Sequence, residues 1–89
     1  MNANAQVDGY LIKGQVIDRQ TREAVPYAAV FIVGFEDSGV MADSTGRFII
    51  ERVKPGIRQF TAIQMGYRTE VTAEYAITPY TPLILIEMD

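Results

Sequence analysis

The apolar residues of this chain occur in short runs, and each run is followed by Gly, Pro, Asp or other residues that favour turns. The runs are rich in β-branched and aromatic residues, and none has the 3.6-residue repeat of an amphipathic helix. We expect seven strands, at 10–18, 27–33, 38–42, 47–51, 57–65, 68–73 and 83–88, and a loop at 75–81. This pattern predicts an all-β chain, a seven-stranded antiparallel β-sandwich.

The run 27–33 is apolar on both of its faces. If Ala28, Val30 and Ile32 point into the core, the alternate residues point outward, and the run 57–65 follows the same rule. The outward apolar side chains form a candidate partner face: Tyr27, Phe31, Val33, Ile63 and Met65. Large exposed apolar patches often mark a partner site. The alternatives are that a loop or the N-terminal tail covers the face, or that a bulge reverses the alternation.

The segment ADSTGRF, residues 42–48, allows two interpretations. Asp43 together with Glu36 or Asp37 could offer oxygen ligands to Ca²⁺, but calcium loops need several more carboxylates at alternating positions. In the other interpretation, Asp43 accepts hydrogen bonds from the N–H groups of residues 44–46, and Gly46 adopts a positive φ. We therefore expect Asp43 and Gly46 to form a structural turn, and we expect no metal ion.

Gly66 and Tyr67 follow an expected strand directly, where a turn is needed. An exposed tyrosine there could stack on a ligand. We favour a structural role, in which the Tyr67 ring packs over the end of the sandwich and its hydroxyl meets a backbone group. Val71, on the next expected strand, is predicted to face inward.

The composition excludes several classes of protein. The 89 residues suffice for one small core, and the chain contains neither Cys nor His, the residues that most hydrolases and zinc sites use. The net charge of −3, without a Lys or Arg run, argues against nucleic-acid binding. No apolar run is long enough for a transmembrane helix. We expect no enzyme activity, no cofactor and no small-molecule ligand.

The first nine residues are polar and small, and we expect them to form a flexible tail ahead of a domain at 10–89. Ala3-Asn4-Ala5 has the small-x-small form that precedes a signal-peptidase cut, which suggests a remnant near a cleavage site and therefore export. The alternative is an ordinary frayed tail.

Turn and core residues recur here in a characteristic order: Gly14-Gln-Val16-Ile-Asp18, Thr21, Pro26, Ala28-Ala-Val30, Gly39, Asp43, Gly46-Arg-Phe48, Pro55-Gly56 and Gly66-Tyr67. From about residue 11 to 88, the chain resembles the carboxypeptidase-regulatory-like, or transthyretin-like, domain. That domain is found at the N-terminus of many TonB-dependent outer-membrane transporters of Bacteroidetes. The resemblance implies a prealbumin-like Greek-key sandwich and an exported location, and it brings no catalytic residues with it.

Two positions depart from the family's pattern. The family usually has Pro-Gly-Ala before the second strand, whereas this chain has Pro26-Tyr27-Ala28, and Ala42 stands where the family favours Thr before the loop aspartate. We expect a non-catalytic accessory domain of an exported envelope protein, in the periplasm, the outer membrane or at the cell surface. Its partner would be a larger parent protein, such as a TonB-dependent nutrient transporter, or a neighbouring envelope protein. The alternative is a free-standing carbohydrate- or peptide-binding domain that uses loops around Glu36, Asp43 and Tyr80.

Overall fold

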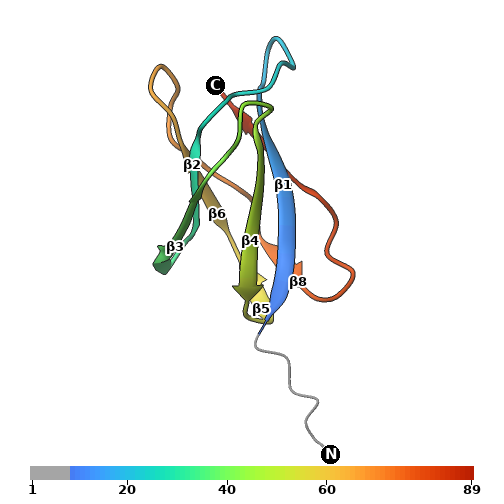
Figure 1. Cartoon of the computed structure of the whole chain (residues 1–89). Helices are drawn as coiled ribbons and strands as arrows, with labels where there is room; N and C mark the ends of the chain where they lie inside the picture. The colour runs from blue at the N-terminus through green and yellow to red at the C-terminus, as the bar shows by residue number, and fades with distance from the viewer. Residues whose placement is uncertain (1–8) are drawn as a thin grey trace, which may run out of the picture.

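The computed structural model describes residues 9–89, and the expected tail lies outside this range except for Gly9. The strands within it are β1 (Tyr10–Asp18), β2 (Ala29–Ile32), β3 (Phe35–Met41), β4 (Arg47–Val53), β5 (Gly56–Arg58), β6 (Phe60–Ile63), β7 (Glu70–Val71), β8 (Tyr75–Ile77) and β9 (Ile84–Met88). Figure 1 shows these strands arranged in two layers. The expectation of an all-β, sandwich-like chain is confirmed.

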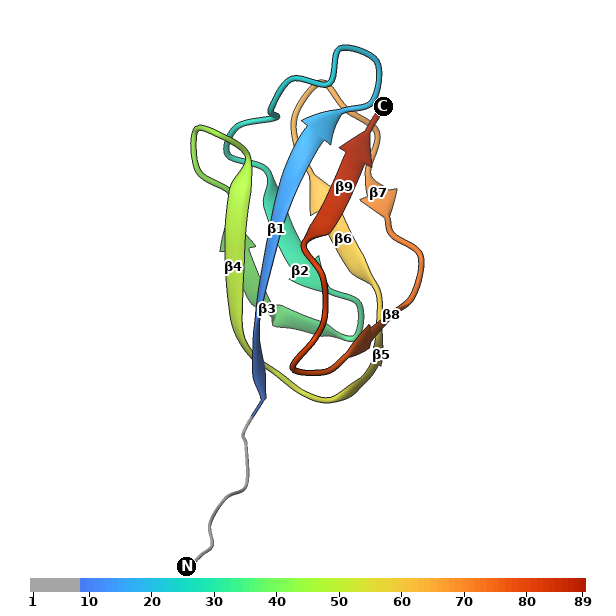
Figure 2. The same ribbon diagram turned by 90° about the vertical axis from the view of Figure 1, so that its right-hand side faces the viewer.

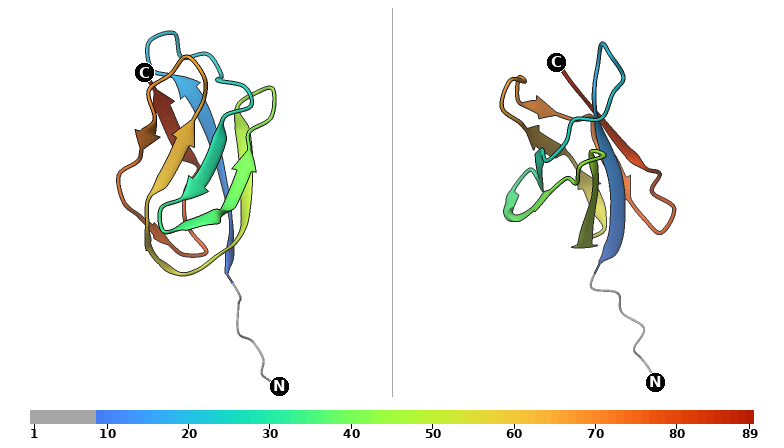
Figure 3. Two further views of the ribbon diagram at one scale, coloured as in Figure 1. Left: turned by 90° about the vertical axis from the view of Figure 1, so that its left-hand side faces the viewer. Right: turned by 45° about the horizontal axis from the view of Figure 1, so that its top comes forward.

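One layer is the three-stranded sheet β4-β1-β9, and the other is the four-stranded sheet β3-β2-β6-β7. Figure 2 shows the first sheet in front of the second, and Figure 3 shows the opposite side. A small sheet, β5-β8, lies at the end of the sandwich where β1 begins. The described residues thus form nine strands in three sheets rather than seven strands in two.

The pairing of the first and last strands corrects the expectation of an entirely antiparallel sandwich. β1 pairs with β9 in parallel, from Gly14 opposite Ile84 to Asp18 opposite Met88. β1 pairs with β4 on its other side in the antiparallel sense. Parallel strands need a long connection between them, and here the rest of the domain provides it.

The expected strand at 57–65 is divided at Gln59 into β5, which pairs with β8, and β6, which pairs with β2. β8 lies in the segment that we expected to be a loop. The inward prediction for Val71 is wrong, because 49 % of this residue is exposed. The buried position belongs to Thr72, whose hydroxyl accepts a hydrogen bond from the Phe60 N–H (3.0 Å) and donates one to the Ala73 carbonyl (2.8 Å).

The core lies between the two layers and is built from alternate residues of facing strands. Ala28, Val30 and Ile32 are buried, as expected. Other fully buried side chains are Ile12, Val16, Val25, Ile50, Val53, Phe60, Ile84, Ile86 and Met88. Gly14 lies beneath the Phe48 ring, and a Cβ atom there would overlap that ring and approach the Ile84 carbonyl. The glycine of β1 therefore makes the space that Phe48 fills.

Candidate interaction surfaces

The outer side of the four-stranded sheet is apolar. Its register places Met41, Ala29 and Ile63 in one row across β3, β2 and β6. The next row contains Phe31, Thr61 and Val71 on β2, β6 and β7. We call the outward side chains of these rows, together with Val33 at the end of β2, the β2 face. Neither row carries a charged side chain, and the acids Glu36 and Asp37 lie beyond the rows, near the β2–β3 turn.

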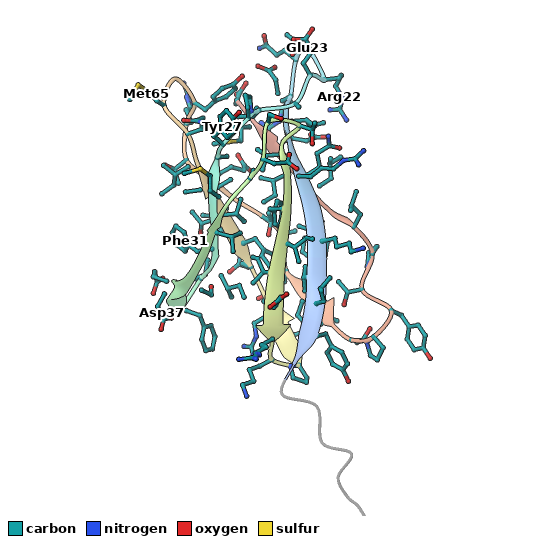
Figure 4. The ribbon with its side chains drawn as sticks, in the orientation of Figure 1. Arg22, Glu23, Tyr27, Phe31, Asp37 and Met65 are labelled. Atoms are coloured by element: carbon teal, nitrogen blue, oxygen red, sulfur yellow. The ribbon has the colours of Figure 1, made fainter. Side chains whose placement is uncertain are left out.

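The structure places all five predicted partner residues on this side of the molecule or at its edge. Val33 and Ile63 are 43 % and 44 % exposed, whereas Phe31 is half-buried in the row beside Thr61. Tyr27 and Met65 lie in the loops above the sheet, and Figure 4 shows Met65, Phe31 and Asp37 along the outer side of the β2–β3 layer. The Gln64 side-chain amide donates to the Pro26 carbonyl (2.6 Å), which joins these two loops.

Met41 and Val71 are also exposed on the β2 face, although the sequence pattern did not identify them. Met41 is 71 % exposed at the end of β3. Met41 pairs with Ala29 of the apolar run 27–33. The alternation along 38–42 therefore indicates that Met41 points outward, but only when the register between β2 and β3 is known. Val71 could not be found in this way because β7 contains only two residues.

Asp43 forms a turn that closes on itself. Its Oδ1 atom accepts hydrogen bonds from the Thr45 hydroxyl (2.6 Å), the Thr45 N–H (2.8 Å) and the Arg47 N–H (3.0 Å). The Thr45 N–H is one of the donors that we expected, whereas the Thr45 hydroxyl and the Arg47 N–H are not. These bonds, that of the Thr45 hydroxyl first, lower the pKa of Asp43 below its usual range. Gly46 has a φ of 76°, and a Cβ atom there would overlap the Val16 carbonyl oxygen.

Tyr67 packs against the core cluster, and its hydroxyl donates to Asp18 Oδ2 at 2.9 Å. The expected backbone partner is therefore wrong. Asp18 Oδ1 accepts from the N–H groups of Gln20 (2.8 Å) and Thr21 (3.0 Å). The Thr21 N–H, followed by the Tyr67 hydroxyl, lowers the pKa of Asp18, and the same hydroxyl bond raises the pKa of Tyr67. Gly66 precedes this tyrosine with a φ of 87°.

A second apolar surface covers the outer side of the three-stranded sheet, and the sequence pattern did not identify it. Leu11, Ile49, Leu83 and Leu85 are between 38 % and 58 % exposed there. Each of them adjoins a buried residue along the chain, so the alternation in the sequence already indicates that they point outward. Along this side run two adjoining hollows of about 630 and 190 Å³, which share Lys13 and Leu83. We call the two hollows together the β1 groove.

The loops of the alternative binding hypothesis do not converge. Glu36 and Asp43 lie at opposite ends of β3, roughly 20 Å apart along an extended strand. Tyr80 is 90 % exposed, whereas the half-buried Tyr75 packs edge-on against Phe60 with ring centres 6.1 Å apart. Within residues 9–89, no three acidic side chains gather as a cation site would require.

The packed sheets and their tight turns define a small β-sandwich domain whose exposed features are two apolar sheet faces. The family model of the CarboxypepD_reg-like domain matches residues 12–82, and the chain belongs to this family. No curated protein matches the chain in sequence. In the part of the chain that the structure describes, no helix is long and apolar enough to span a membrane.

The departure at Tyr27 from the Pro-Gly-Ala pattern has a structural counterpart. Tyr27 has a φ of 63°, in the left-handed region where glycine is least costly. Its N–H donates to the Asp43 carbonyl (3.2 Å), which ties this strained residue to the β3–β4 turn. The chain therefore holds a glycine-type backbone conformation while presenting an exposed aromatic ring.

Proposed function

We propose that this domain is a non-catalytic interaction module of an exported envelope protein, the N-terminal module of a TonB-dependent outer-membrane nutrient transporter. Membership of the CarboxypepD_reg-like family supports the accessory role. The absence of both His and Cys from the sequence removes the usual general bases and nucleophile pairs. The resemblance to the transthyretin-like domain also supports assigning the fold to the prealbumin-like Greek-key sandwiches.

The β2 face carries this proposal. Its two central rows contain no charged side chain, although 21 % of the residues in the chain are charged. A partner could cover these rows without removing an ion from water, which costs several kcal/mol for each buried charge. Burying an exposed aliphatic side chain completely contributes about 1.5–3 kcal/mol. Contact between this face and the parent protein, or a neighbouring envelope protein, is the mechanism that we propose.

The intact mass of the native gene product tests the first part of the proposal. An antibody against this domain would capture the product from fractionated envelopes of the source cells. We expect a species many times heavier than 9.9 kDa in the outer membrane fraction. A free periplasmic species near 9.9 kDa would contradict the accessory role.

Site-specific photo-crosslinking in the native protein tests the face itself. A photoreactive amino acid would replace Ile63 or Met65, and a matched control would carry it at Ile57 or Tyr80, which are exposed but lie away from the β2 face. We expect crosslinks to the parent chain or to an envelope protein from the first pair only. Equal crosslinking from both pairs, or none from Ile63 and Met65, would rule out the β2 face as the contact surface.

A further inference from the structure

The β1 groove contains charged side chains, which the rows of the β2 face lack. Its floor contains Ile49 and Leu83, with Leu11 in the smaller hollow, and each of these residues is at least half exposed. Lys13 and Arg47 line the larger hollow, and Lys13 also lines the smaller one. The groove therefore combines an apolar floor with two cations, on a chain whose net charge is −3.

The two cations are close neighbours in the sheet. Lys13 lies opposite Ile49 and Gln15 lies opposite Arg47, so Lys13 and Arg47 occupy diagonal positions on β1 and β4. Diagonal positions of this kind are about 7–8 Å apart. Among the described residues neither cation forms an ion pair, because the ion pairs there all involve Arg19 or Arg22.

One acid, Asp43, lines the groove, and one of its two carboxylate oxygens is already engaged. Asp43 lies at the rim, where its Oδ1 atom accepts three hydrogen bonds from Thr45 and Arg47. Glu51, the next outward residue of β4 after Ile49, lines neither hollow. After the Thr45 hydroxyl, which lowers the pKa of Asp43 most, the positive charge of Arg47 contributes to the lowered pKa, but the Asp43 and Arg47 side chains form no ion pair among the described residues. Lys13 and Arg47 can therefore receive an external carboxylate, which would gain charge-assisted hydrogen bonds from them.

The shape of the groove favours an extended chain. The smaller hollow, lined by Leu11, Thr81 and Pro82, continues the larger one past Lys13 and Leu83. Alternate side chains of an extended peptide point the same way about 6.6–6.8 Å apart, which suits two adjoining hollows on one surface. A flat lipid surface would not enter hollows of this kind, so the charge and the shape together favour a peptide.

We propose that the β1 groove binds an extended segment of a partner protein in which apolar and acidic side chains alternate. The apolar side chains occupy the two hollows over Ile49, Leu83 and Leu11, and carboxylates pair with Lys13 and Arg47. The groove lies on the three-stranded sheet and meets the β2 face only at Met41, which lines the larger hollow. The residues that carry this proposal lie outside the β2 face, so it does not depend on the function proposed above.

Selection from displayed random peptides of about nine residues tests the proposal, with the intact domain as bait. We expect enrichment of sequences that alternate Leu, Ile or Val with Glu or Asp. One enriched peptide is then synthesised, labelled with a fluorophore and titrated by fluorescence anisotropy. The absence of enrichment, or enrichment of basic or uncharged sequences, would overturn the proposal.

Charge reversal then locates the binding site. The double variant Lys13→Glu/Arg47→Glu is expected to weaken binding of the synthetic peptide at least about tenfold, because it replaces attraction with repulsion. The matched control Lys54→Glu/Arg68→Glu changes the same charge at exposed positions outside the groove, and should stay within about twofold of the unchanged chain. Equal affinities for the two variants would reject the assigned groove.

Two further measurements test whether the apolar floor of the groove contributes to peptide binding in addition to the charges. Leu83→Ser should weaken binding about fivefold or more, whereas Ile57→Ser, at a residue with the same 58 % exposure on β5, should not. When the peptide is added to the unchanged ¹⁵N-labelled domain, the NMR signals of the Lys13, Ile49 and Leu83 amides should change their chemical shifts. Shifts confined to the β2 face, or a stable dimer formed without peptide through the groove, would each overturn the proposal.

Discussion

The Tyr67 hydroxyl donates a hydrogen bond to Asp18 Oδ2 at 2.9 Å, across 49 positions of sequence. The bond joins the loop after β6 to the end of β1, and Asp18 at the same time holds the turn that follows it through the N–H groups of Gln20 and Thr21. One carboxylate thus fixes a local turn and a distant loop. Because each of these donors favours the ionised carboxylate, the pKa of Asp18 is lowered in the folded chain.

This lowered pKa predicts a loss of stability in acid. In the unfolded chain Asp18 titrates near the usual aspartate pKa of 3.8. Its contribution to the stability of the fold is therefore complete above that pH and disappears as the pH falls through the lower folded value. The difference in melting temperature between the unchanged chain and Asp18→Asn should therefore shrink from pH about 7 to pH about 3.

The control for this pH experiment is Asp37→Asn, since the Asp37 carboxylate accepts no hydrogen bond from the other described residues in this turn, where Glu36 and Ser38 make the side-chain bonds. Its melting temperature should follow that of the unchanged chain at every pH. NMR titration of Asp18 should in addition show its pKa rising part of the way back in Tyr67→Phe, because the larger contribution of the Thr21 N–H remains. A constant difference between Asp18→Asn and the unchanged chain across the pH range would contradict the prediction.

Gly14→Ala should destabilise the domain severely. The added Cβ would overlap the Phe48 ring and approach the Ile84 carbonyl, so either β9 or Phe48 would have to move. Overpacking a core typically costs 1–3 kcal/mol, and we expect a loss of about 3 kcal/mol or more here because one of the obstructing groups is backbone. Denaturant unfolding would measure the loss. Gly39→Ala, where the nearest atom lies at an ordinary 3.5 Å, should change stability by less than about 1 kcal/mol.

Tyr27→Gly should leave the stability unchanged or raise it by up to about 1 kcal/mol, because glycine adopts a φ of 63° without steric cost. Tyr80→Gly serves as the control, since Tyr80 is also exposed but is absent from the residues with positive φ. There the added freedom of the unfolded chain should lower stability by about 0.4–1 kcal/mol. Thermal unfolding of both variants tests the difference, and equal losses would show that Tyr27 is not strained.

Phe60→Ala should remove about 3–5 kcal/mol from the free energy of unfolding, since its ring is fully buried and meets Tyr75 edge-on. A domain of this size has few kcal/mol to lose, so partial unfolding at room temperature is the expected result. Phe35→Ala, where the ring is 44 % exposed and contacts the Arg58 guanidinium, should cost less than about 1 kcal/mol. Urea titration would distinguish the two, and a small effect at Phe60 would contradict the assigned core.

The parts of the fold that could be predicted are those set by local pattern. The strand Tyr10–Asp18 follows from its alternation and the polar turn behind it, and the burial of Val30 and Ile32 follows from the same rule. β8 could not be predicted in this way, because only its pairing with β5 makes Tyr75–Ile77 a strand. A pairing between distant segments leaves no trace in the short window that contains either of them.

The two candidate surfaces also differ in how far the local sequence pattern predicts them. The β2 face was predictable in part, because the apolar runs 27–33 and 57–65 supply Phe31, Val33 and Ile63. Met41 and Val71 come from β3 and β7 and were not identified.

For the β1 groove, alternation along each expected strand indicates that Ile49 and Leu83 point outward, but it does not show that they meet. Lys13, Ile49 and Leu83 come from three separate segments that meet only when β4 and β9 flank β1. The partner of Tyr67 was missed for a similar reason, since Asp18 lies on a strand far from it in sequence.

The parallel pairing of β1 with β9 also sets how the domain would respond to tension. In Figure 2 β1 enters the sheet at one end of the molecule, and β9 leaves it at the other. A force that pulls these two strands apart along their length would shear the whole ladder between Gly14–Asp18 and Ile84–Met88, loading its hydrogen bonds together rather than one after another. We therefore expect the first and last strands to act as a mechanical clamp, so that the rest of the sandwich unfolds under load only after that clamp yields.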